Sequence, residues 1–117
     1  MPVPAITLVS TDLWLQSRVA AVARGAGAVL GSVAGPPVPA DAVLVAVDCN
    51  HHQAERLAVI AALIADHPDR QVLAILPHRD LVTRRAARAA GAHRCVPNSA
   101  LDAVLPGILA RASGPGW

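Results

Sequence analysis

The chain has 117 residues, which is enough for one compact domain and too few for two. Hydrophobic residues make up 54% of it and charged residues 15%, so we expect a sizeable core. The net charge of +2 and the near absence of aromatic residues disfavour nucleic-acid binding, which needs a basic surface and stacking platforms. No apolar run approaches the roughly 18 residues of a membrane span, and no basic leader opens the chain. We therefore expect a cytoplasmic protein.

The first predicted elements are a strand and a helix. Residues 5–9 form a short apolar run that stops at Ser10, Thr11 and Asp12, three residues that favour helix N-caps. Apolar residues then recur at helical spacing from Leu15 onward, and two glycines shortly afterwards should end the helix.

The next part of the chain predicts two strands without a helix between them. Residues 28–30 form the second predicted strand. Residues 35–39 contain three prolines, which remove backbone donors and block helical turns. Residues 42–47 are apolar throughout, as expected for the buried centre of a parallel sheet. We expect the proline-rich stretch to cross as extended chain, leaving the sheet thinly covered and open to a partner.

The second half of the chain continues the alternation. A helix is predicted over residues 51–66, a strand over 71–76, a helix over 80–90 and a strand over 93–96. Ser99, with an acid three residues later, resembles a capping box that opens a last helix.

Alternation of this kind predicts an α/β fold with right-handed crossovers. For five parallel strands we expect the flavodoxin-like three-layer sandwich with strand order 2-1-3-4-5. The helix between the second and third strands is missing or replaced by a proline-rich loop. Residues 1–112 should form this single domain, with residues 113–117 as a flexible tail.

Three stretches resemble the receiver domains of two-component response regulators, a bacterial signalling family. Residues 86–98, AARAAGAHRCVPN, are similar to the fourth helix and fifth strand of receivers. Residues 41–45, DAVLV, are similar to the strand that carries the phosphorylated aspartate, and residues 6–9 are similar to the first strand. The resemblance covers almost the whole chain and implies the receiver fold.

Carried over residue by residue, the receiver chemistry is incomplete. The family has two adjacent acids after its first strand to hold magnesium, where this chain has Ser10 and Thr11, with Asp12 one place later. The phosphoacceptor position falls on Ala46, although Asp48 could serve if the strand is two residues longer. The hydroxyl position falls on Leu76 and the lysine position on Asn98, in a chain whose ten basic residues are all arginine.

The resemblance therefore implies a degenerate receiver, or pseudo-receiver. It would act as a signalling and protein-interaction module without enzymatic activity, cofactor or aspartyl phosphorylation. Two alternatives stay open. One is a genuine receiver phosphorylated at Asp48. The other is a small metal- or ligand-binding protein, because zinc ligands lie near the ends of strands at Cys49, His51, His52 and His78.

An interaction surface is predicted around the fourth receiver helix, the fifth strand and the fifth helix. Four arginines concentrate there, and the last helix carries more apolar residues than one buried face needs. The predicted surface residues are Arg84, Arg85, Arg88, Arg94, Leu101 and Leu105. This surface would bind a protein partner, either an acidic protein or a second copy in a two-fold homodimer.

Overall fold

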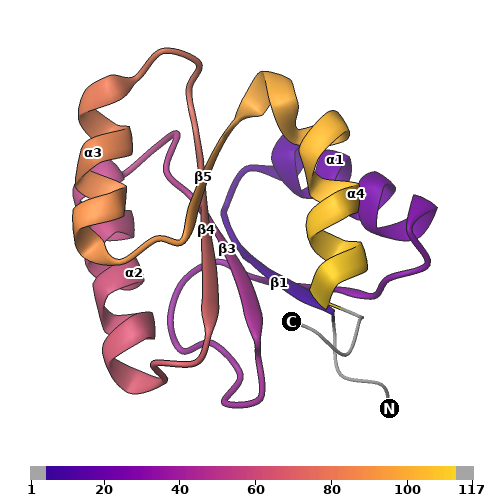
Figure 1. Ribbon diagram of the computed structural model, residues 1–117, viewed down its shortest axis with the longest axis horizontal. Helices are drawn as coiled ribbons and strands as arrows, with labels where there is room; N and C mark the ends of the chain where they lie inside the picture. The colour runs from indigo at the N-terminus through magenta and orange to yellow at the C-terminus, as the bar shows by residue number, and fades with distance from the viewer. Residues whose placement is uncertain (1–4, 113–117) are drawn as a thin grey trace.

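The protein is a five-stranded parallel sheet between two layers of helices, in a computed structural model that describes residues 5–112 (Figure 1). The strand order is β2-β1-β3-β4-β5, and each neighbouring pair is parallel. This is the predicted flavodoxin-like order. The strands are β1 (Ile6–Val9), β2 (Leu30–Val33), β3 (Leu44–Asp48), β4 (Gln71–Leu76) and β5 (Arg94–Pro97).

Two α-helices cover each face of the sheet. Helices α1 (Leu13–Gly25) and α4 (Leu101–Ala112) lie on one face, and α2 (Gln53–Asp66) and α3 (Leu81–Ala90) on the other (Figure 1). Each face encloses its own aliphatic core, with alternate strand residues pointing to either side. None of the helices in the described part of the chain is long and apolar enough to cross a membrane.

Local backbone chemistry moves several element boundaries from their predicted positions. β2 begins at Leu30 rather than residue 28, because the amide of Ala28 still donates to the carbonyl of Ala23 in α1. α2 begins after His52, whose left-handed φ of 53° ends the preceding loop. The predicted capping box at Ser99 is wrong, because residues 98–100 form a 3₁₀ turn, η1 (Asn98–Ala100), from which α4 continues.

The chain between β2 and β3 contains no helix, as predicted. We call residues 34–43 the crossing segment. Two buried arginines hold it in place: Arg56 donates to the carbonyl of Ala34 at 3.0 Å, and Arg70 donates to the carbonyl of Ala42 at 2.9 Å. Charged donors on backbone carbonyls thus replace the hydrogen bonds that a helix would make internally.

Helix α4 corrects one part of the predicted interaction surface. Leu101 and Leu105 are each 1% exposed and pack into the core beneath α1 and α4. They cannot contact a partner in the folded chain. The prediction failed because α4 packs against both α1 and the sheet, so that one helix buries a broader apolar stripe than a single contact requires.

Candidate functional site at the carboxyl edge of the sheet

Asp48 is the last residue of β3, so the strand does extend to the acid that the sequence offered as a phosphoacceptor. Its side chain is 3% exposed and accepts three hydrogen bonds. The Ser10 hydroxyl donates to one carboxylate oxygen at 2.7 Å. The backbone amide and the side-chain amide of Asn50 donate to the other oxygen at 3.0 and 2.8 Å. Both carboxylate oxygens are therefore occupied by donors from this chain.

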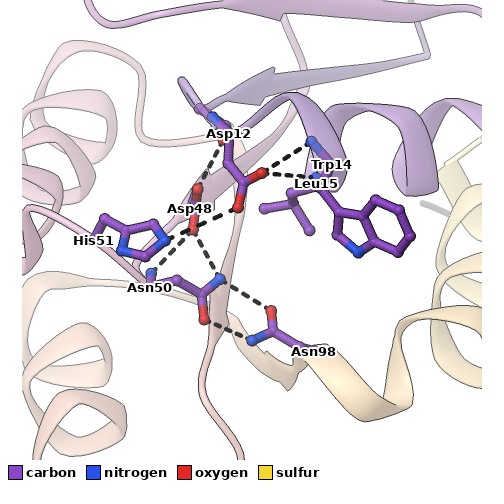
Figure 2. A network of polar contacts seen from close by, with 8 residues as sticks. Asp12, Trp14, Leu15, Asp48, Asn50, His51 and Asn98 are labelled. Carbon is purple, nitrogen blue, oxygen red and sulfur yellow. Dashed lines mark hydrogen bonds and ion pairs between the residues drawn. The ribbon is translucent and has the colours of Figure 1, made fainter.

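The polar residues after β1 serve local structure. Asp12 is the N-cap of α1, because one of its oxygens accepts the backbone amides of Trp14 and Leu15 at 2.9 and 3.2 Å (Figure 2). The backbone amide of Asp12 in turn donates to the Ser10 hydroxyl at 3.0 Å. Thr11 is exposed. The Ser10 hydroxyl therefore links Asp48 to the backbone of Asp12, and the side chain of Asp12 caps α1.

Asn98 lies where β5 ends, and its amide forms a reciprocal pair with the amide of Asn50. Each side chain donates to the other's oxygen, at 2.9 and 2.6 Å (Figure 2). The Asn50 amide nitrogen also reaches Asp48, so the pair connects the ends of β3 and β5 through the carboxylate. Arg18 of α1 donates to the backbone carbonyl of Asn98 at 2.9 Å. A neutral amide network thus occupies the position where receivers have a lysine.

A pocket of about 400 Å³ lies beside this network. Its walls come from the start of α1 and from the ends of β3, β4 and β5. Trp14 is the only aromatic residue among them and is 76% exposed. The lining residues are Asp12, Trp14, Leu15, Arg18, Asn50, His51, Pro77 and Asn98.

The four candidate metal ligands do not come together. Cys49 is fully buried under α2 and α3, and burial, followed by the charge of Asp48, raises the pKa of its thiol to about 12. His51 has one ring nitrogen 3.9 Å from Asp12, while His52 and His78 are exposed. Among residues 5–112 no three histidine, cysteine or acidic side chains are grouped to hold a metal ion. A buried thiol that resists deprotonation is a poor ligand and a poor nucleophile.

Leu76, at the receiver hydroxyl position, is fully buried at the end of β4. Its side chain belongs to the core under α2 and α3 and supplies no polar group to the pocket. The structure therefore brings Ser10, Asp12, Asp48 and Asn98 to one edge of the sheet, and it places Leu76 in the packing below that edge.

Three of the predicted surface arginines are exposed, namely Arg85 and Arg88 on α3 and Arg94 on β5. Arg84 is half-buried. Within the described residues, none of these four guanidinium groups forms an ion pair, whereas Asp102 is paired with Arg18 at 3.5 Å and Asp80 caps α3. Asp80 and Asp102 are thus engaged within their own chain.

Solved structures with the same architecture include CheY-like and response regulator proteins. A CheY-like protein (tadZ) from Pseudomonas aeruginosa PAO1 has a TM-score of 0.80 at 16% identity, covering 92% of this chain and 98% of that one. A protein described as pilus-assembly-related, from Burkholderia pseudomallei K96243, has a TM-score of 0.71 at 18% identity and 97% coverage of both chains. This chain therefore has the fold of CheY-like receivers.

A third similar structure is that of a phosphorylated protein. It is a response regulator from Burkholderia pseudomallei with a phosphorylated aspartic acid and a calcium ion, with a TM-score of 0.74 at 16% identity, covering 92% of this chain and 68% of that one. No family model and no curated protein matches the present chain. The likeness accordingly defines the fold, and the site has to be judged on its own residues.

Sequence reasoning missed three residues that organise the site. Asn50 is one of them, because its amide donates to Asp48 and pairs with Asn98. Gln16 donates to the carbonyl of Ser10 at 2.9 Å, and Arg18 joins α1 to β5. Asn50 is a polar residue close to the end of β3, whereas Gln16 and Arg18 lie within α1, and neither position specifies a partner.

Proposed function

We propose that this protein is a receiver-like protein-interaction module that does not use aspartyl phosphorylation and has no enzymatic activity. The observation that carries the proposal is the burial and the hydrogen bonding of the Asp48 carboxylate. Its two oxygens accept three hydrogen bonds from Ser10 and Asn50, and its side chain is 3% exposed. Attachment of a phosphoryl group to either oxygen would compete with the donors that this oxygen already accepts.

The donor set around Asp48 also lacks what phosphoryl transfer requires. Magnesium prefers several carboxylate oxygens and waters in octahedral geometry. Asp12 also lies at this edge, but one of its oxygens is occupied by two backbone amides of α1. The Asn50–Asn98 pair supplies no positive charge to a developing phosphoryl group.

Incubation with acetyl phosphate and Mg²⁺ tests the proposal. The intact mass of the wild-type protein should not change. A double variant, Ser10→Asp with Asn98→Lys, restores an acid and a lysine and should gain some labelling, which Asp48→Asn would abolish. A mass increase of one phosphoryl group on Asp48 of the wild-type chain would instead establish the alternative, a genuine receiver.

The other alternative, a metal- or ligand-binding rim at residues 49–52, is less well supported because Cys49 is buried and the exposed histidines do not converge. Metal analysis of the purified protein tests it. A stoichiometric metal that is lost on His51→Ala substitution would favour this alternative over an interaction module.

The interaction surface that we propose consists of the exposed arginines of α3 and β5, namely Arg85, Arg88 and Arg94, with Arg84 at its margin. These cations have no ion-pair partner within residues 5–112, so an acidic protein surface would complement them. We infer a cytoplasmic partner, with residues 1–112 acting as the domain that binds it. The fold likeness to a pilus-assembly-related protein makes an assembly apparatus of that type a specific candidate.

A further inference from the structure

A groove lies between the crossing segment and helix α2, on the sheet face where a helix would normally follow β2. Its volume is about 300 Å³. The crossing segment contributes Pro36, Pro37 and Val38 to one wall, and α2 contributes the other. The remaining lining residues are Val59, Ala62, Leu63, Asp66 and Arg70.

Both ends of the crossing segment are hydrogen-bonded to arginine side chains of α2 and of the loop that follows it. The guanidinium group of Arg56 donates to the carbonyl oxygen of Ala34 at 3.0 Å, and that of Arg70 donates to the carbonyl oxygen of Ala42 at 2.9 Å. Arg70 is 1% exposed and also donates to the carbonyl of Leu63 at 3.3 Å. The segment is therefore not free to fold over α2 and fill the groove itself.

The exposed side of α2 has the composition of a helix-packing surface. Between Glu55 at its first turn and Asp66 at its last residue, every exposed residue of α2 is alanine, namely Ala58, Ala61, Ala62 and Ala65. Alanine faces allow two helices to approach closely, and they cost little side-chain entropy when they are covered. A solvated helix would ordinarily carry charged residues at such positions.

Charge distinguishes the two ends of this surface. Asp66 lines the groove and forms an ion pair with Arg70 at 3.6 Å, but its side chain stays 78% exposed. Asp41 and Asp69 are also exposed and precede Ala42 and Arg70 in the chain, so three acids face one buried arginine at this end. The lower end of the groove, at the amino edge of the sheet, is therefore acidic. An occupant should present aliphatic side chains along α2 and positive charge at this end.

Helix α3 of another copy has this pattern. Its exposed face begins with Leu81 and Val82, which are 59% and 80% exposed, and continues with Arg85 and Arg88. A helix of ten residues is about 15 Å long, so it fits beside the longer α2. Placed parallel to α2, as crossover helices of one sheet are, its aliphatic turn meets the alanines and its arginines reach the acidic end.

We propose that the groove binds helix α3 of a second copy of this protein, which takes the place of the missing helix. The inference rests on the proposed function, because it identifies the acidic partner of the exposed arginines as the groove of a second copy. The two surfaces differ, so the contact is heterologous: each copy offers one helix and one groove, and association continues into a chain or ring.

Sedimentation velocity at up to roughly 1 mM protein, at low and high salt, tests the proposal with two blocking variants. Ala62→Arg fills the groove, and Arg85→Glu with Arg88→Glu reverses the charge of the helix. Each should weaken self-association about tenfold or more. A mixture of the two variants should form a 1:1 heterodimer that does not grow, because only one intact groove and one intact helix remain.

Matched controls lie on the opposite face of the sheet, where Ala21→Arg and Arg24→Glu change exposed residues of α1. Both should associate as the wild type does. A wild-type protein that stays monomeric would overturn the proposal, and so would oligomers that Ala62→Arg leaves intact, which is the result for a two-fold contact through α3, β5 and α4. Neither result bears on Asp48, which the acetyl phosphate experiment tests separately.

A cross-link provides a readout that does not depend on blocking variants. In a Cys95→Ser background, an Ala62→Cys chain mixed with an Ala89→Cys chain should form a disulfide-linked heterodimer under mild oxidation. Cys49 is fully buried and should not compete. Absence of this heterodimer, at concentrations where the wild type associates, would overturn the proposed geometry.

Discussion

At the scale of single residues, the carboxyl edge of the sheet is organised by Ser10. Its hydroxyl donates to Asp48 and accepts the backbone amide of Asp12, so it satisfies a buried carboxylate and fixes the start of α1. A second acid at this position would place two negative charges together, which is useful for binding a cation and unfavourable without one. Serine makes the edge stable in the absence of any ion.

Ser10→Ala should therefore destabilise the protein by about 1–3 kcal/mol, because it leaves one oxygen of a buried carboxylate without a donor. Urea denaturation followed by far-ultraviolet circular dichroism measures this change. Ser17→Ala, at an exposed position of α1, is the matched control and should alter stability by less than about 0.5 kcal/mol. Equal effects of the two substitutions would contradict the assigned role of Ser10.

The residues of the site could be predicted from the sequence only in part. Placing Asp48 and Asn98 at strand ends followed from periodicity and from the receiver resemblance. The amide pair between Asn50 and Asn98 did not, because it depends on the orientation of two side chains 48 positions apart. Short polar side chains at loops have many local partners, and only the packed structure selects among them.

At the scale of elements, helices α1 and α3 each begin at an aspartate whose side chain caps the helix. Asp80 accepts the backbone amide of Thr83 at 3.0 Å at the start of α3, and α3 ends at Gly91 with a φ of 116°. Hydrogen bonds from Thr83, and then from Gln53, hold the pKa of Asp80 below its usual value. Such a carboxylate stabilises the fold above its unfolded pKa, and this contribution is lost as pH falls through the folded pKa.

Asp80→Asn keeps a good capping side chain and removes the titrating group. The wild type should melt at a higher temperature than this variant near neutral pH. The difference should shrink as pH falls below about 4, the usual pKa of an aspartate, and through the lowered pKa of the folded carboxylate. Thermal melts from about pH 7 to about pH 3 measure it. Asp41→Asn, at an exposed loop position, is the control, and the same pH dependence there would contradict the cap assignment.

Element types were predictable where a single physical signal dominated. Three prolines in residues 35–39 excluded a helix before β3, and the glycine after residue 90 marked the end of α3. The start of α4 was not predictable, because η1 and α4 join without a break and the capping signal at Ser99 was not used. Likewise, the breadth of the buried face of α4 depends on its contact with α1, which periodicity alone does not reveal.

At the scale of the whole molecule, the two faces of the sheet are covered unequally. One face carries α1 and α4 over a continuous core, whereas the other carries α2, α3 and the crossing segment (Figure 1). Strand β2, at the edge of the sheet, is only partly buried, while β1 and β3 are buried throughout. The least protected part of the fold should be β2 with the crossing segment.

Amide hydrogen exchange should resolve this difference. Backbone amides of residues 34–43 should exchange faster than those of β3 and β4. Arg70→Gln removes donors from the carbonyls of Ala42 and Leu63. This substitution should make the amides of residues 34–43 exchange faster still, and it should lower the free energy of unfolding by about 3 kcal/mol. Arg24→Gln, at an exposed position of α1, should change neither quantity. Protection of the crossing segment equal to that of β3 would refute this ranking.

The exposed ring of Trp14 determines how this protein can be observed in solution. The chain has no tyrosine or phenylalanine, and its other tryptophan, Trp117, lies outside the described residues. The indole of Trp14 is 76% exposed in the folded protein, so unfolding should change the polarity around it little. The same ring lines the pocket beside Asn50 and Asn98. In a Trp117→Phe variant, the tryptophan fluorescence should therefore change when a molecule enters the pocket. Unfolding should change the same fluorescence very little.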